Sequence, residues 1–461
     1  MINMNMFAHI MMFAWIPIVF GLFVKLPPRR AVIVSFIFAW LFLPMAEYKI
    51  PGFPNYTKMS ATCVGVFIGA AIFNTQQLLS FRLRLIDLPM IIWCLCPMAS
   101  SLSNDLGLYD GLASTLTQTV TWGFPYIIGR IYFCDPAAIK EFAVGIFIGG
   151  IIYMPLCWYE IRMSPQLHHM LYGFTQDSFS ETYRYGGWRP MVFMQHGLAV
   201  GMWMASASLI GAYLWFSNSI KKIFKIPVSY VVIMLILTLL FCKSTGAIVL
   251  FILGLSALLV AHKLKTKILV ICLLLVPIVY LSVRATGYWD GDNLAHFIYD
   301  NFDRERALSL WTRFDNENML SKKAMERPAF GWGGWGRSRI YDEQGNDITI
   351  TDSLWIIALG TNGLVGLGAL TISILLPCVI LMRRYRTREW FNPKVVATAT
   401  LAVLLTLYMI DNLLNAMINP IYMLAVGGIT SFTKEQFEEI PGFAEVPDET
   451  WMAPVYQPRF L

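Results

Sequence analysis

Charged residues are scarce in this chain. They make up 14% of its 461 residues, and hydrophobic residues make up 57%, whereas a soluble domain carries about 25% charged residues. This deficit excludes an ordinary soluble protein and favours helices surrounded by lipid. Alternating strand-like segments, which an outer-membrane barrel would need, are also missing. The fold class predicted from composition is therefore an all-α polytopic membrane protein.

The chain also has no internal repeat, no low-complexity run and no cysteine in its long loops. A disulfide framework would need cysteines in those loops, so we interpret the cysteines as packing residues of apolar segments. The first apolar segment has no basic residue before it and no small-residue cleavage site after it, which favours a retained helix over a signal peptide. The eight cysteines are Cys63, Cys94, Cys96, Cys134, Cys157, Cys242, Cys272 and Cys378.

Long apolar runs are what the sequence has in abundance. A membrane-spanning helix needs about 20 mostly apolar residues, and charges, proline and glycine separate the runs. Thirteen spans are predicted, or twelve if one of the short hinges within 227–261 or 395–432 does not divide two spans. The predicted spans are 6–24, 31–47, 59–79, 88–103, 113–133, 140–159, 190–216, 227–242, 244–261, 268–284, 353–382, 395–411 and 413–432.

Basic residues alternate between the connections and so predict orientation. One set of short connections holds eighteen lysines and arginines, and the opposite set holds only Lys49, Lys58 and Lys243. Because basic loops stay in the cytoplasm, the richer set is assigned to the cytoplasmic face. Its members are Lys25, Arg29, Arg30, Arg82, Arg84, Arg130, Lys140, Lys221, Lys222, Lys225, Lys263, Lys265, Lys267, Arg383, Arg384, Arg386, Arg388 and Lys394.

This orientation divides the chain into a bundle and its appendages. Residues 1–284 form a bundle of about ten spans with an outer loop at 160–189, and residues 353–432 form the C-terminal spans. Between them, residues 285–352 form a large extracytoplasmic loop. The polar, acidic tail at 433–461 is predicted to be cytoplasmic and mostly unstructured.

The large outer loop holds a predicted helix and a flexible turn. Apolar positions spaced through Arg304–Arg327 predict a helix lying on the membrane surface, which Pro328 ends. The following run, Phe330-Gly-Trp-Gly-Gly-Trp-Gly336, has four glycines that permit a tight backbone close to a ligand. The alternative is a linker that returns the chain to the membrane.

Cations gather on the same outer surface, where the positive-inside tendency should deplete them. Arginine binds phosphate bidentately, so Arg313 and Arg327, joined by Arg189 and Lys243, are candidates to bind a lipid pyrophosphate. Alternatively, the loop arginines pair with nearby acidic residues in a solvated helical network. Lys243 would then extend to the membrane interface.

Three residue types complete the candidate site. Asp352, at the entry to span 353–382, is a candidate general base, or else a helix N-cap. His196 is a candidate for proton handling or glycan contact, or else a buried core histidine. Trp332 and Trp335 are candidates to stack on sugar rings, or else anchors at the membrane interface.

The order of these features resembles the O-antigen ligase and O-antigen polymerase (Wzy-like) superfamily of bacterial polysaccharide assembly. The resemblance rests on Arg313, on the helix that runs into Glu-Arg-Pro-Ala-Phe-Gly-Trp-Gly333, and on Gly360-Thr-Asn-Gly-Leu-Val-Gly366 in the next span. Lys243-Ser-Thr-Gly-Ala247 looks like the polar break before the family's outer loop. The resemblance covers about 190 residues, from roughly 240 to 430.

The family resemblance implies a GT-C-like helical bundle in the bacterial inner membrane, with its active face towards the periplasm. Such an enzyme transfers a glycan from undecaprenyl pyrophosphate to a sugar hydroxyl with inversion, and it uses no metal and no other cofactor. The implied partners are the lipid-linked glycan, an acceptor glycan or glycolipid, the bilayer and other polysaccharide-assembly proteins, and no nucleic acid. Family arginines bind the pyrophosphate, and Arg313 matches them best.

This sequence departs from the family at two positions. Asp352-Ser-Leu-Trp stands where the ligases have their proposed catalytic histidine, and Lys243 stands where an arginine is common. These departures favour a polymerase or an exopolysaccharide-specific transferase over a ligase acting on lipid A core.

Two other functions remain open. A polysaccharide or lipid transporter would have discontinuous helices with paired charges near mid-membrane, and the polar residues of the last spans are its best support. A catalytically inactive scaffold would be consistent with the missing histidine. The polar residues concerned are Asp411, Asn412, Asn415 and Asn419.

Overall fold

The computed structural model describes residues 4–50, 53–177, 179–301 and 304–432. The part described is mostly helical, and its few strands form short hairpins. Seven of its helices are long and apolar enough to cross a membrane. The protein is therefore a multi-pass helical membrane protein. The predicted tail at 433–461 lies outside the described residues.

The first half of the chain supplies the helices that surround the centre. Three antiparallel hairpins lie in the connections of the whole chain: β1 (Glu47–Tyr48) with β2 (Tyr56–Thr57), β3 (Tyr183–Arg184) with β4 (Gly187–Trp188), and β5 (Lys222–Ile223) with β6 (Ile226–Pro227). The helices are α1 (Met6–Lys25), α2 (Pro28–Phe42), α3 (Lys58–Phe73), α4 (Thr75–Leu79), η1 (Leu85–Asp87), α5 (Leu88–Ser103), α6 (Gly107–Gln118), η2 (Thr119–Gly123), α7 (Phe124–Tyr132), α8 (Pro136–Met163), α9 (Leu167–Tyr172) and η3 (Phe179–Thr182).

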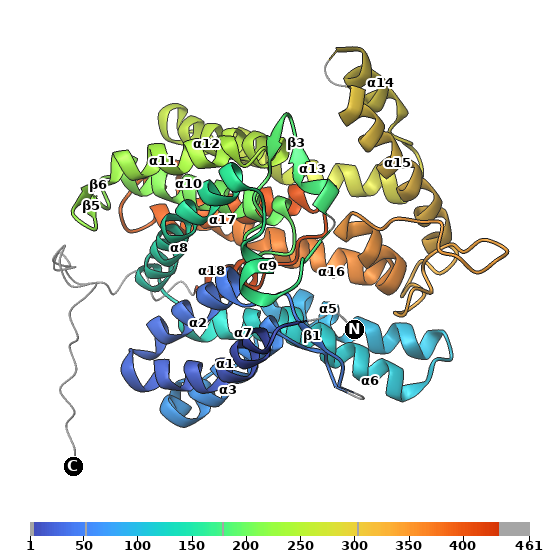
Figure 1. Ribbon diagram of the computed structural model, residues 1–461, viewed down its shortest axis with the longest axis horizontal. Helices are drawn as coiled ribbons and strands as arrows, with labels where there is room; N and C mark the ends of the chain where they lie inside the picture. Colours follow the sequence, from blue (N-terminus) through green and yellow to red (C-terminus); the bar gives the residue numbers. More distant parts are fainter. Residues whose placement is uncertain (1–3, 51–52, 178, 302–303, 433–461) are drawn as a thin grey trace.

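The second half supplies the centre of the bundle and the large outer loop. Almost every residue of α10, α17 and α18 is buried, and Figure 1 shows α17 and α18 near the middle of the molecule. The helices are α10 (Gly197–Phe216), α11 (Val228–Phe241), α12 (Thr245–Leu264), α13 (Ile268–Ala285), α14 (Asp292–Asn301), α15 (Arg304–Met325), α16 (Leu354–Arg384), η4 (Thr387–Glu389), α17 (Val396–Asp411) and α18 (Pro420–Thr430).

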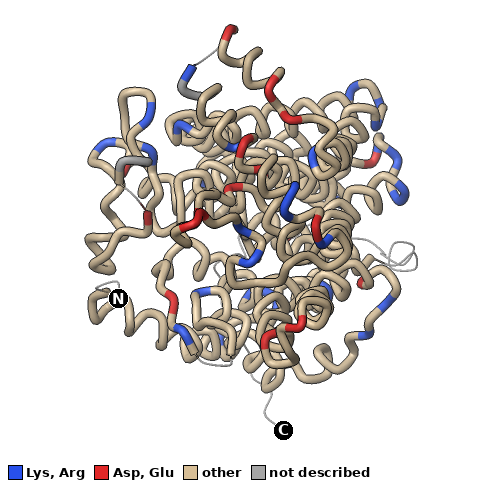
Figure 2. The backbone as a smooth tube through the Cα atoms, turned by 90° about the vertical axis from the view of Figure 1, so that its right-hand side faces the viewer, with Lys and Arg blue, Asp and Glu red and all other residues tan. Residues whose placement is uncertain are grey.

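Connections lie at two opposite ends of the bundle: in Figure 1 the β5–β6 hairpin is at the left and the outer loop at the right, which is the side that faces the viewer in Figure 2. At the end with the basic connections, contacts join segments far apart in the sequence: Arg29 with Asp135, Arg30 with Glu141, Arg84 with Ser431, and Lys265 with Thr387. At the other end, the same is true of Asn5 with Tyr172, Met45 with His168, Asn104 with Gly331, and Leu354 with Asn412.

Two predicted spans begin later than expected, and both differences lie at the second end. The predicted span 190–216 is helical only from Gly197, and the predicted span 413–432 only from Pro420. In each case a residue with a side-chain cap precedes the helix: His196 accepts from the N–H of Leu198, and Asn419 accepts from that of Ile421. The preceding segments, 190–196 and 412–419, are irregular. Such backbone occurs at membrane depth only where protein or a cavity surrounds it.

Helix α16 is interrupted at Gly363, where φ is 64° and ψ is −166°. That conformation is essentially restricted to glycine. The turn that follows α15 fills the interruption. The N–H of Trp332 donates to the carbonyl of Gly360 (2.8 Å), and the N–H of Leu364 donates to that of Pro328 (2.7 Å). The glycine-rich turn predicted from the sequence is therefore docked into a broken helix.

Candidate functional site

The large outer loop is attached to the bundle by α15. Its helices α14 and α15 project from one side, at the upper right in Figure 1. The predicted helix Arg304–Arg327 is close to the observed Arg304–Met325, and α15 packs against α13, α14 and α16. Phe314 and Ala324, two of its apolar residues, are buried, whereas Leu308 is 56% exposed. One stripe of α15 therefore faces protein.

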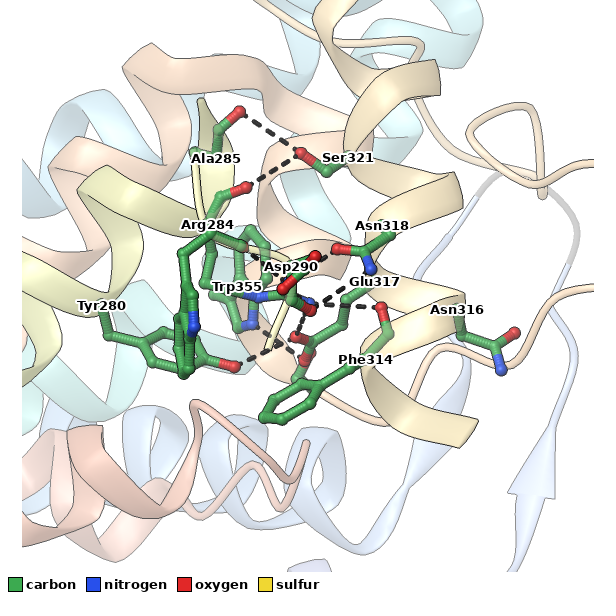
Figure 3. Close-up of polar contacts among 12 residues, drawn as sticks. Tyr280, Arg284, Ala285, Asp290, Phe314, Asn316, Glu317, Asn318, Ser321 and Trp355 are labelled. Atoms are coloured by element: carbon green, nitrogen blue, oxygen red, sulfur yellow. Dashed lines mark hydrogen bonds and ion pairs between the residues drawn. The ribbon is translucent and has the colours of Figure 1, made fainter. Parts of the chain in front are cut away.

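A buried ion pair lies at the base of the loop (Figure 3). The Arg284 guanidinium, at the end of α13, contacts the Glu317 carboxylate of α15 at 2.9 Å, and the two side chains are 1% and 5% exposed. Arg284 also donates to the carbonyls of Trp289 (3.0 Å) and Asp290 (2.6 Å) and to Oδ1 of Asn318 (2.7 Å). This arginine therefore joins the start of the loop to its main helix.

Glu317 extends the same network to the entry of α16. Its Oε1 accepts from the Ser353 hydroxyl (2.8 Å) and from Nε1 of Trp355 (3.1 Å). Its Oε2 accepts from the Tyr280 hydroxyl (3.0 Å) as well as from Arg284. A buried carboxylate with four donors is well compensated, so Glu317 fixes the residue that follows Asp352.

Arg313 and Asp352 meet at the surface beside this network. Arg313 lies one helical turn before Glu317 on α15, and its Nε is 3.4 Å from Oδ2 of Asp352. The two side chains are 25% and 45% exposed, so solvent and solutes reach both. Arg313 also donates to the carbonyl of Leu414 (2.7 Å) and to Oδ1 of Asn415 (3.3 Å). Two of the predicted site residues are thus brought together.

The N-cap alternative for Asp352 is wrong. Ser353 occupies the N-cap position of α16, and its side chain bonds to Glu317 instead of capping the helix. The first N–H of α16, from Leu354, donates to the carbonyls of Asn412 (3.1 Å) and Asn415 (3.0 Å). The irregular segment 412–419 therefore caps α16 and leaves the Asp352 carboxylate beside Arg313.

Further charges lie behind the Arg313–Asp352 pair. Asp411, at the end of α17, is 8% exposed and lies within electrostatic range of both Arg313 and Arg189. Its Oδ1 accepts from Asn415 (2.9 Å), and its buried Oδ2 has no hydrogen-bond partner among the described residues. Burial of a carboxylate oxygen without a hydrogen-bond partner is costly. From the sequence, Asp411 supports only the transporter alternative.

Arg189 and His196 flank the irregular segment 190–196. Arg189 is 2% exposed, and its side chain packs against Gly197 and approaches the Ser244 hydroxyl at 3.5 Å. His196 has Nε2 at 3.5 Å from Oδ2 of Asp177, and its Nδ1 caps α10. His196 is half-buried, so it is not the fully buried core histidine that was the alternative to proton handling or glycan contact.

Lys243 has a structural contact of its own. Its ammonium donates to the carbonyls of Arg184 (3.0 Å) and Tyr185 (2.9 Å), so it holds the turn of the β3–β4 hairpin. Lys243 adjoins Ser244, which Arg189 approaches, but the described contacts do not join it to the Arg313–Asp352 pair.

Arg327, Trp332 and Trp335 lie at the far end of α15. Helix α15 runs about 18 Å from Arg313 to its end at Met325, at 1.5 Å per residue, and Arg327 follows that end. Its guanidinium carbon is 4.7 Å from the centre of the Trp332 ring, and Trp335 donates to Asp110 of α6 (2.7 Å). The structure therefore separates Arg327, Trp332 and Trp335 from the Arg313–Asp352 pair, and one pyrophosphate cannot bridge Arg313 and Arg327.

Sequence reasoning did not single out Arg284 or Glu317. The sequence held a partial signal for Glu317, because it follows Arg313 by four residues and so shares its helix face. Among the residues that the structure describes, no group of three or more His, Cys, Asp or Glu could hold a metal ion. No family model and no curated protein matches the chain.

Proposed function

We propose that this protein is an inner-membrane glycosyltransferase. It would move a glycan from undecaprenyl pyrophosphate to an acceptor sugar hydroxyl on the periplasmic face, as a polysaccharide polymerase or ligase with inversion of configuration. The observation that carries the proposal is the partly exposed Arg313–Asp352 pair, held by buried charges at the end of the bundle opposite the basic connections.

The pair supplies both functions that such a transfer needs. The acceptor oxygen attacks the anomeric carbon, and its proton passes to the Asp352 carboxylate, a role typically worth about 10²- to 10⁴-fold in rate. The bond from the anomeric carbon to the pyrophosphate oxygen breaks, and the electron pair leaves with the lipid pyrophosphate. The Arg313 guanidinium stabilises the developing negative charge. No metal takes part in this scheme.

The surrounding charges support the assignment of these roles. Arg189 would add positive charge behind the pyrophosphate. When the donor displaces the present contacts of Arg313, Oδ2 of Asp411, which has no hydrogen-bond partner among the described residues, would accept a hydrogen bond. His196 borders the same region, because the neighbouring Gln195 contacts Met417. Arg327 and Lys243, proposed from the sequence as pyrophosphate ligands, are less suited because their described contacts lie elsewhere.

The proposed architecture is a GT-C-like bundle of twelve or thirteen spans with a large helical loop outside. Each of the thirteen predicted segments coincides largely with helix in the described structure, although several of these helices are short for a membrane span. The positive-inside tendency then assigns the site to the periplasm. The acceptor would be a glycan or glycolipid, and other polysaccharide-assembly proteins would be natural partners.

The test is glycan transfer by the purified protein in proteoliposomes that contain a polyprenyl-pyrophosphate-linked oligosaccharide. Arg313→Ala and Asp352→Ala are each expected to abolish transfer while the protein remains folded, and Asp352→Asn to do the same because the amide cannot accept the proton. Lys322→Ala and Asp315→Ala serve as matched controls, since both are exposed positions on α15. Normal transfer by both alanine variants of the pair would refute the proposed site.

A lipid or polysaccharide transporter is the second candidate, and the interruption of α16 at Gly363 favours it. Discontinuous helices line the substrate sites of many transporters. The same proteoliposomes separate the two functions. A transporter would move the lipid-linked glycan between leaflets without forming a new glycosidic bond, whereas the proposed enzyme would form that bond without moving the lipid.

A further inference from the structure

A buried lysine stands at the start of α3 without a counter-charge. Lys58 is 6% exposed, and its ammonium donates to the carbonyls of Trp40 (3.2 Å) and Phe193 (3.3 Å). Among the described residues, no carboxylate pairs with Lys58. Burial of a charge is costly unless an opposite charge compensates it. The surroundings of Lys58 therefore lack one negative charge.

Lys58 lines a small cavity between α2, α3 and the start of α18. The cavity leaves about 10 Å³ for the centre of a water-sized particle, which is about the space that one water molecule needs. Phe36, Trp40 and Pro420 are among the other lining residues. An ammonium has three N–H donors, and the two carbonyls account for two of them. One donor is thus left for a particle in the cavity.

The indole of Trp40 supplies a second donor. Trp40 is 5% exposed, and its Nε1 has no hydrogen-bond partner among the described residues. The Lys58 ammonium lies 5.0 Å from the centre of the Trp40 ring. Thr62, whose hydroxyl could have served as an acceptor at this cavity, accepts from Nε1 of Trp15 instead (2.9 Å). Because a buried N–H without a partner is costly, the cavity suits a ligand that accepts hydrogen bonds.

Two helices begin at the cavity, and their dipoles favour the same charge. Lys58 is the first residue of α3, and Pro420 is the first residue of α18. The N-terminus of a helix carries about half a positive charge and attracts anions. The carbonyl of Trp40, near the end of α2, offsets part of this charge. A full ammonium and two helix N-termini still leave the cavity positive.

We propose that this cavity binds one small monovalent anion of the size of chloride, held by the Lys58 ammonium and by the Nε1–H of Trp40. The anion lies at the edge of the Trp40 ring, where the N–H projects, and it neutralises Lys58. Since Lys58 also contacts the irregular segment 190–196, and Pro420 follows the irregular segment 412–419, the bound anion stabilises the packing of both segments. This site lies outside the proposed transfer reaction and does not depend on it.

The test is thermal unfolding of the full chain in detergent, at constant ionic strength, with chloride replacing gluconate, an anion too large for the cavity. A ligand that binds only the folded protein raises its Tm with concentration, so the Tm should rise with chloride and then saturate. Lys58→Met should abolish this response. Trp40→Phe should weaken chloride binding roughly 10- to 100-fold, because a hydrogen bond to a charged group is a strong one.

Two matched controls separate the site from general effects of substitution. Trp203→Phe removes another buried indole N–H that has no partner among the described residues, at a position that does not line the cavity. Lys49→Met removes a lysine from an exposed position in the connection before α3. Both controls should respond to chloride as the unmodified protein does.

Diffraction from crystals grown in bromide gives an independent measurement. The anomalous signal should place one bromide beside Lys58 and Trp40, and this measurement and Trp40→Phe remain decisive even if Lys58→Met does not fold. Three outcomes would overturn the proposal: an equal Tm in chloride and gluconate, as for a cavity that holds only water, an equal response of Trp40→Phe and Trp203→Phe, or no bromide at the cavity. No glycan is present in either measurement, so this proposal and the proposed glycan transfer can each be wrong without the other.

Discussion

Removal of the Glu317 carboxylate should detach the outer loop from the bundle. Arg284 and Glu317 are 2.9 Å apart and 1% and 5% exposed. At an effective dielectric constant of about 20, their gross attraction is about 6 kcal/mol, although desolvation offsets much of it. Loss of one partner from a buried pair leaves an uncompensated charge, which typically costs about 3–5 kcal/mol.

We therefore expect Glu317→Ala to lower the free energy of unfolding by about 3–5 kcal/mol. Glu317→Gln should cost less, about 1–3 kcal/mol, because the amide oxygen still accepts one hydrogen bond. Asp315→Asn is the matched control, since Asp315 is exposed two residues earlier on α15. The measurement is denaturant titration in detergent micelles, together with limited proteolysis between residues 285 and 352. If the free energy of unfolding of Glu317→Ala were within about 1 kcal/mol of that of the control, as for a surface substitution, the buried pair would not hold the loop.

Two more perturbations test other parts of the outer end. Burial lowers the pKa of His168 in α9 to about 4, whereas the unfolded chain has a pKa of about 6.5. The free energy of unfolding is therefore at its full value above pH 6.5 and falls as the pH drops towards 4, by about 2 kcal/mol at pH 5. His168→Phe should remove this pH dependence from thermal unfolding, whereas His169→Phe, at the exposed neighbour, should retain it. Gly363→Ala should expel the turn after α15, because its Cβ would lie 2.4 Å from the Ala329 carbonyl oxygen. Proteolysis near Trp332 should then accelerate, whereas Gly368→Ala, at a position with open space around it, should leave the rate of proteolysis unchanged.

Much of the helical architecture could be predicted from the sequence. The presence of membrane-length helices was confirmed, and α15 ends within two residues of its predicted end. These features are encoded locally, because the length of an apolar run and a terminating proline act on the residues beside them. The late start of α18 also had a local signal, since Asn419-Pro420 is a typical helix N-terminus, but the apolar residues before it favoured a longer span.

The candidate site could be predicted only in part. Arg313 and Asp352 were both chosen from the sequence, and they meet. Arg327 and Lys243 were chosen for the same chemistry, but their described contacts are with Trp332 and with the β3–β4 hairpin. Charge and loop membership are properties of single residues, whereas the side of a loop on which an arginine projects depends on how the whole loop packs.

The sequence by itself determined that this is a helical membrane protein whose basic connections alternate with poorly basic ones, because lipid imposes a length and a charge rule on each segment separately. Only the tertiary structure decided which polar groups share a site. Glu317 is joined to Arg284 and Ser353 across more than thirty residues in each direction. No local pattern encodes such pairings, because burial of a charge is stable only when packing brings its partner from elsewhere in the chain.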